Sequence, residues 1–148
     1  MNNYSEKAVE NFKQGYNCAQ SVFLAFAEEF GFDKKTALML SSSFGGGMGR
    51  LREVCGAVSS MFAIAGLKYG YTSPTDDIKK AEHYEFIQNL AKEFSSRTGS
   101  IICRELLGLE EGADSPIPST RTPEYYKERP CEFFVKAAAE IIEEKILN

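Results

Sequence analysis

The sequence predicts an all-α fold, a single-domain irregular helical bundle of five to six helices with a central small-residue helix. Apolar residues recur at helical spacing along almost all of the 148-residue chain. No run alternates apolar and polar residues like a half-buried strand, and no Asn-Gly or Asp-Gly hairpin signal occurs. No change in composition marks a linker, so we expect one domain over 1–148, irregular because its helices differ in length.

The first three helices are expected in the N-terminal third of the chain. Residues 4–14 carry an apolar face. Asn17 is a good N-cap for a helix over 17–31, and Asp33 for a helix over 33–43. Glycines follow the first two of these segments, where helices commonly end.

The fourth helix is expected over 53–68 and is unusually rich in small residues. These are Gly56, Ala57, Ser59, Ser60, Ala63, Ala65 and Gly66. Because glycine inside a helix costs about 1 kcal/mol relative to alanine, several small residues together indicate a close neighbour. We therefore expect this helix at the centre of the bundle.

The remaining helices lie in the C-terminal half. The longest is expected over 75–97, followed by a short one over 101–107. The proline-rich stretch 110–129 is expected to be a loop, and Pro130 to open the last helix, because proline suits a first helical position. The apolar positions of the longest helix are Ile78, Ala81, Tyr84, Ile87, Leu90, Ala91 and Phe94.

Charge and hydropathy exclude several functional classes. A net charge of −4 argues against a nucleic-acid-binding face. The longest apolar stretch, 54–67, is shorter than the roughly 20 residues of a membrane span, so no membrane insertion is expected. The N-terminus lacks the pattern of a signal peptide, so we expect a cytoplasmic protein with reduced cysteines.

The four cysteines share one expected context, the first turn of a helix or its immediate vicinity. There, free backbone N–H groups and the helix dipole favour negative charge, which lowers the pKa of a thiol. No Cys-x-x-Cys pair occurs, so neither a thioredoxin-like motif nor a zinc knuckle is present. Any shared site must be assembled from Cys18, Cys55, Cys103 and Cys131 by the fold.

Three interpretations of these cysteines are open. In the first, which we favour, they form a redox-active site that works by thiol–disulfide exchange or electron transfer. Cys55 is expected in the reactive pair because of its glycine loop and the nearby Arg50 and Arg52, and any of the other three cysteines could resolve. In the second, all four thiolates bind an iron–sulfur cluster or zinc. In the third, the cysteines are inert and pack in the core of a structural or binding module.

The segment "FGGGMGR" fits no phosphate-binding motif, because it lacks the Lys-Ser/Thr of a P-loop and the spacing of a dinucleotide fingerprint. Gly45, Gly46, Gly47 and Gly49 are instead expected to let the chain turn sharply on its approach to Cys55 and pass close to a bound group. Their free N–H groups would suit a thiolate or a cluster sulfur.

Four blocks of the sequence together resemble the C-GCAxxG-C-C family, whose members are described as redox-active. The blocks are "GYNCAQSVFLAF", "FGGGMGRLREVCGAV", "CRELLG" and "PCEFFVKAAAEI", each with one cysteine. The family pattern has glycine where this chain has Ser60, a residue that is still small.

The resemblance implies a redox role for the cysteines but fixes no substrate. A related domain in split-Soret cytochromes makes a cysteine-ligated iron–sulfur centre an option, although this chain has no haem motif. The expected partner is a redox protein or a small thiol of unknown identity. The exposed end of the last helix would allow a homodimer.

Overall fold

The computed structural model describes residues 3–109 and 113–148, and within these ranges it contains helices but no β-strand. The α-helices are α1 (Tyr4–Lys13), α2 (Cys18–Ala27), α3 (Lys34–Ser41), α4 (Gly45–Met48), α5 (Gly56–Tyr69), α6 (Asp77–Thr98), α7 (Cys103–Leu106), α8 (Pro123–Glu128) and α9 (Cys131–Ile141). Two 3₁₀ turns, η1 (Glu28–Phe30) and η2 (Ser42–Phe44), and a final π-helical turn, η3 (Ile142–Ile146), complete the list. The predicted all-α class is confirmed, with more helices than expected.

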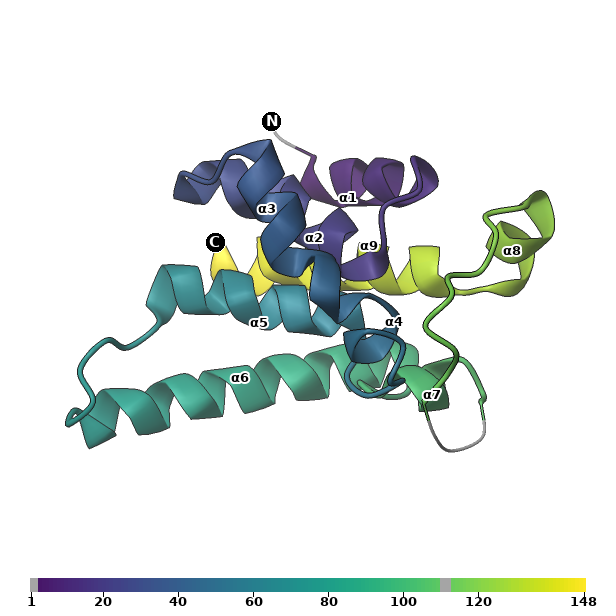
Figure 1. Ribbon diagram of the computed structural model, residues 1–148. Helices are drawn as coiled ribbons and strands as arrows, with labels where there is room; N and C mark the ends of the chain where they lie inside the picture. Colours follow the sequence, from purple (N-terminus) through teal and green to yellow (C-terminus); the bar gives the residue numbers. More distant parts are fainter. Residues whose placement is uncertain (1–2, 110–112) are drawn as a thin grey trace.

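Helix α5 is the central element, as predicted. It packs against α2, α6 and α9, and Figure 1 shows it between the long α6 and the N-terminal helices. Its buried residues are Gly56, Ala57, Val58, Ser60, Met61, Ile64 and Ala65. Because most of these side chains are small, α2 can approach α5 closely, and their contact fixes the centre of the bundle.

The predicted caps Asn17 and Asp33 are correct, but the start of α5 differs from the prediction. Asn17 makes a capping box with Gln20 and Asp33 caps α3. Helix α5 begins at Gly56, not at residue 53, and Cys55 is its N-cap. Residues 53–55 are not helical because their backbone forms hydrogen bonds with residues 101–103, just before and at the start of α7.

The prediction of a loop over 110–129 is wrong for Pro123–Glu128, which form α8. The Thr122 side chain accepts a hydrogen bond from the N–H of Tyr125, and Pro123 occupies the first helical turn. A proline in this position favours a helix start rather than a loop. Residues 110–112 of the predicted loop lie outside the described residues.

The expected apolar face of α6 is buried only towards its C-terminal end. Leu90 and Phe94 are in the core, whereas Ile78 is 75% exposed and Tyr84 49% exposed. The cause is length: α6 has 22 residues and its neighbour α5 has 14, so the first turns of α6 extend beyond the bundle.

One end of the molecule collects several helix starts. In Figure 1, α4, α7 and the first turns of α5 and α9 lie near one another, away from the loop that joins α5 to α6. Since each cysteine lies at or next to such a start, this end of the bundle is where the thiols gather.

Candidate functional site

A run of left-handed backbone conformations shapes the glycine-rich segment. Gly46 and Gly47 have φ angles of 70° and 71°, and Gly49 of 62°. Met48, Arg50 and Arg52 also have positive φ, which is uncommon for residues with a side chain. The run is closed by backbone hydrogen bonds, including that from the N–H of Glu53 to the carbonyl of Gly47, 3.0 Å. The chain therefore reverses tightly on itself.

Two of these glycines lie where no side chain fits. A Cβ on Gly47 would lie 2.6 Å from Cβ of Cys103 and 2.9 Å from the Cα of Arg52. A Cβ on Gly45 would overlap the side chain of Asn17. The absence of side chains thus lets the loop pack directly against two cysteine-bearing segments.

The segment before α5 pairs with the segment before α7. The N–H of Cys55 donates to the carbonyl of Ile101 (2.8 Å), and the N–H of Cys103 donates to that of Glu53 (2.6 Å). Val54 and Ile102 form an isolated antiparallel bridge. This pairing joins residues about fifty positions apart and brings Cys55 and Cys103 to the same end of the fold.

Cys18 is positioned by α5. A Cβ on Gly56 would lie only 2.8 Å from the Cys18 sulfur, so the glycine leaves room for the thiol. The buried Ser60 hydroxyl donates to the carbonyl of Ala19, 2.6 Å away. The serine that replaces the glycine of the family pattern therefore preserves the close contact and adds a hydrogen bond between α5 and the first turn of α2.

All four cysteines line a single cavity of about 230 Å³. Cys55 and Cys103 are buried, and Cys18 and Cys131 are partly exposed. The remaining walls combine mainly apolar side chains with Gly45, Gly46, two neutral polar residues and four arginines. The polar residues are Asn17 and Ser119, and the arginines are Arg50, Arg52, Arg121 and Arg129. The fold thus assembles from separate helices a site that spacing alone could not place.

Cys18 has the environment of a thiolate. A hydrogen bond from the Cys55 thiol lowers the pKa of Cys18 to about 6, against the opposing effect of burial, and the backbone N–H groups of Gly46, Gly56 and Ala19 contribute. The same contact and burial raise the pKa of Cys55 well above its ordinary value. Within this pair, Cys18 is therefore the more acidic thiol.

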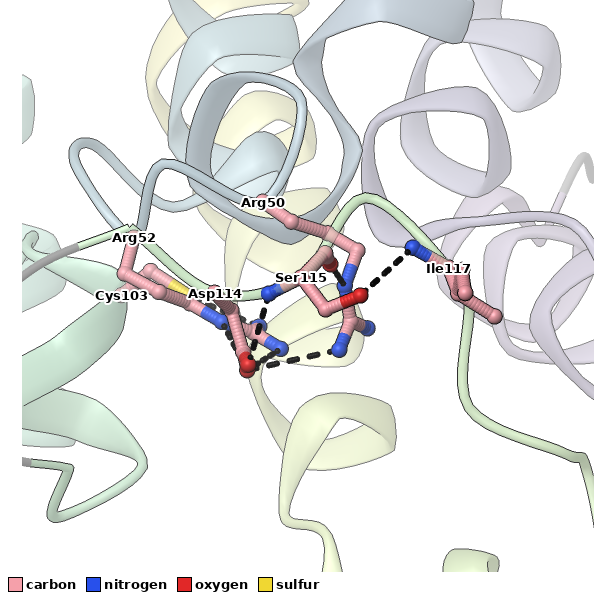
Figure 2. Close-up of polar contacts among 6 residues, drawn as sticks. All are labelled: Arg50, Arg52, Cys103, Asp114, Ser115 and Ile117. Carbon is pink, nitrogen blue, oxygen red and sulfur yellow. Dashed lines mark hydrogen bonds and ion pairs between the residues drawn. The ribbon is translucent and has the colours of Figure 1, made fainter.

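Cys103 is linked to a buried arginine. Nη1 of Arg52 lies 3.5 Å from the Cys103 sulfur, and Nη2 is 3.0 Å from Oδ2 of Asp114, as Figure 2 shows. Burial raises the pKa of Cys103, and Arg52 partly offsets that effect. Arg50 also contacts Asp114, at 3.3 Å. One carboxylate thus compensates two guanidinium groups.

Cys131 is also a weakly acidic thiol. Burial, followed by the charges of Cys18 and Cys103, raises the pKa of Cys131 to about 12, although Arg129 and Arg121 act in the opposite direction. At neutral pH it is protonated. Of the four cysteines, only Cys18 has a lowered pKa, and the pKa of each of the other three is raised.

The local roles differ from the sequence expectation in two respects. Arg52, expected to act on Cys55, contacts Cys103, because the pairing of the two segments directs its side chain there. Of the predicted loop glycines, Gly45 and Gly46 line the cavity, Gly47 packs on Cys103, and the cavity wall does not include Gly49. Their predicted role in binding a cofactor stays a prediction.

Sequence reasoning missed the cavity residues that come from the segment 113–129. Arg121 donates to the carbonyls of Phe12 and Tyr16 and stacks over the Phe12 ring at 4.4 Å. Tyr125 lies beneath both Arg121 and Arg129. The signal that could have found them is the spacing of Arg121, Tyr125 and Arg129 at intervals of four residues, which the surrounding prolines obscured.

Thiolates suit zinc and iron–sulfur clusters, so the donor type fits the predicted metal site, but the arrangement does not. Within residues 3–109 and 113–148, no group of three or more His, Cys, Asp or Glu side chains is placed to hold a metal ion. Metal binding by the four cysteines stays a prediction.

Comparison with known families identifies the chain. The family model described as "Putative redox-active protein (C_GCAxxG_C_C)" matches residues 16–145, which include all four cysteines. The chain belongs to this family. Searches of curated proteins and of solved structures gave no match. The resemblance stated from the four sequence blocks is confirmed, and a redox role is the function that the family description supports.

Among the described residues, no helix has both the length and the apolar character needed to cross a bilayer.

Proposed function

We propose that this member of the C-GCAxxG-C-C family is a thiol–disulfide redox protein in which Cys18 and Cys55 form the reactive pair. The observations that support the proposal are that Cys18 and Cys55 line the same cavity and that Cys55 is the main cause of the lowered pKa of Cys18. Cys18 is partly exposed and Cys55 is buried, as expected for an attacking and a resolving thiol.

The residues around the pair would assist each step. The Cys18 thiolate attacks an external disulfide, and three backbone N–H groups stabilise its charge before the attack. Once Cys18 is in the mixed disulfide, it no longer accepts the hydrogen bond that holds the proton on Cys55. Cys55 then loses its proton and attacks the Cys18 sulfur, which closes the protein disulfide and releases the second thiol.

The pair is tested by trapping the intermediate. Reduced protein is treated with an excess of a small disulfide, and the products are mapped by mass spectrometry. We expect a Cys18–Cys55 disulfide in the wild type, a stable mixed disulfide on Cys18 in Cys55→Ser, and neither product in Cys18→Ser. Cys131→Ser is the matched control, because Cys131 also opens a long helix on the same cavity, and it should form the Cys18–Cys55 disulfide.

Two results would contradict the proposal. One is a mixed disulfide that forms on another cysteine while Cys18 remains free. The other is protein isolated without oxygen that contains stoichiometric iron or zinc lost on substitution of any of the four cysteines, which would favour the metal-binding alternative.

A further inference from the structure

The cavity that holds the cysteines has an unbalanced charge. Four arginines line it, and no aspartate or glutamate does so among the described residues. Asp114 pairs with Arg50 and Arg52 from outside the lining. The remaining two arginines, Arg121 and Arg129, form no ion pair with any described side chain, although the chain as a whole carries a charge of −4.

The free arginines are held in place by neutral groups. Arg121 is fixed by two backbone carbonyls and by the Phe12 ring. Arg129 lies 5.6 Å from the centre of the Tyr125 ring and is partly buried. Aromatic faces and carbonyls position a guanidinium without neutralising it, so both charges remain available to a ligand.

A single thiolate does not balance this positive charge. Cations within a low-dielectric cleft raise the local concentration of anions and hold them by charge-assisted hydrogen bonds. The volume of about 230 Å³ is below the roughly 300–1,000 Å³ of pockets for drug-sized ligands, which favours a small molecule.

We propose that the cavity selects small disulfides that carry carboxylate groups, with Arg121 and Arg129 binding the carboxylate of the half that faces Cys18. This inference rests on the proposed function and names its substrate class. The Cys18 thiolate forms a bond to the nearer substrate sulfur, and the substrate S–S bond breaks to release one thiolate, which takes a proton from the solvent. Cys55 gives up its proton and bonds to the Cys18 sulfur, which breaks the mixed disulfide and releases the nearer substrate half as a thiol. Two electrons pass from the protein dithiol to the disulfide.

The test compares three disulfides of similar size and different charge. These are 3,3′-dithiodipropionate with two carboxylates, bis(2-hydroxyethyl) disulfide with none, and cystamine with two ammonium groups. The rate of Cys18–Cys55 oxidation is measured for each at low salt and divided by the rate of the same disulfide with a small reference dithiol, which removes intrinsic reactivity. We expect the normalised rate to be about tenfold or more higher for the dicarboxylate than for cystamine, with the neutral compound between them.

Two variants and one control locate the effect. Arg129→Gln should lower the dicarboxylate-to-neutral ratio several-fold. Arg121→Gln should do the same, and its fold is checked by circular dichroism because Arg121 also holds backbone carbonyls. Lys127→Gln makes the same charge change at an exposed residue of α8 outside the cavity wall and should leave the ratio unchanged.

The outcomes separate this inference from the proposed function. If the neutral disulfide oxidises the pair but the normalised rates do not depend on charge, or if cystamine is preferred, the selection is overturned and the redox pair stands. If Lys127→Gln lowers the ratio as much as Arg129→Gln, the selection arises from overall charge and not from the cavity. If no disulfide oxidises Cys18 and Cys55, both proposals fail.

Discussion

Cys18 and Cys131 have nearly the same local structure, but the pKa values of their thiols shift in opposite directions. Each is the first residue of a long helix, each is partly exposed, and both line the same cavity. Yet the pKa of Cys18 falls to about 6 and that of Cys131 rises to about 12. The position at a helix start therefore does not determine the acidity of a thiol in this protein.

The difference comes from donors supplied by other segments. Cys18 receives hydrogen bonds from the Cys55 thiol and from the N–H groups of Gly46 and Gly56, all outside its own helix. Cys131 has arginines nearby but is dominated by burial and by the charges of the other cysteines. At Cys18 the hydrogen bonds to the sulfur outweigh the opposing effect of burial, whereas at Cys131 burial outweighs the effect of the nearby arginines.

The largest expected difference is in alkylation. At pH 7 the thiolate fractions of Cys18 and Cys131 differ by about five powers of ten, and the lower nucleophilicity of the less basic sulfur cancels roughly half of that. We expect iodoacetamide to modify Cys18 about a hundredfold faster than Cys131, measured by timed quenching and peptide mass spectrometry. Equal alkylation rates of Cys18 and Cys131 would contradict the difference in acidity between the two thiols.

The pH dependence of the same reaction identifies the cause. Since the pKa of Cys18 is lowered, its alkylation should remain fast as the pH falls and reach half its maximum near pH 6. Cys55→Ala removes the largest lowering effect, so the midpoint should move upwards, towards the value of about 8.5 for a free thiol. Cys55→Ser keeps a hydrogen-bond donor beside Cys18 and should shift the pH midpoint less than Cys55→Ala does. A Cys55→Ala profile identical to the wild type would contradict the assigned cause.

Two glycines of α5, Gly56 and Gly66, test the importance of the close contact between α5 and the Cys18 sulfur. In Gly56→Ala, the new Cβ would lie 2.8 Å from that sulfur and 2.7 Å from the carbonyl oxygen of Phe44. We expect a loss of about 1–3 kcal/mol in the free energy of unfolding and a higher pH midpoint for Cys18 alkylation. Gly66→Ala is the matched control, since nothing lies within 4 Å of its Cβ, and it should stabilise the protein by up to about 1 kcal/mol. Urea denaturation measures the free energy of unfolding of the two variants. If Gly56→Ala and Gly66→Ala destabilised the protein equally, the contact with the Cys18 sulfur would not explain the loss.

The smallest effect concerns two adjacent serines. Ser60→Ala removes the hydrogen bond to Ala19 beside Cys18 and should lower the free energy of unfolding by about 1 kcal/mol. Ser59 has a buried hydroxyl with no hydrogen-bond partner among the described residues, so Ser59→Ala should be neutral or slightly stabilising. Both values come from urea denaturation. A larger loss in Ser59→Ala than in Ser60→Ala would contradict the role of Ser60.

The fold was predictable from local signals, and the site only in part. Asn17, Asp33 and the small residues of α5 are local features, and the structure uses them as expected. The pairing of Glu53 and Cys55 with Ile101 and Cys103 depends on two segments that have no pattern linking them in sequence. For that reason the sequence could place four thiols at helix starts but could not assign Arg52 to Cys103 or the N–H donors to Cys18.

The left-handed run in the glycine-rich segment has a consequence for its arginines. Arg50 and Arg52 adopt a backbone conformation that disfavours any residue with a Cβ by roughly 1–2 kcal/mol each, and that glycine would adopt freely. Glycine at either position would relieve the strain but delete a guanidinium from the cavity wall. The chain thus retains two cations at a conformational cost in a segment where four neighbouring positions already carry glycine.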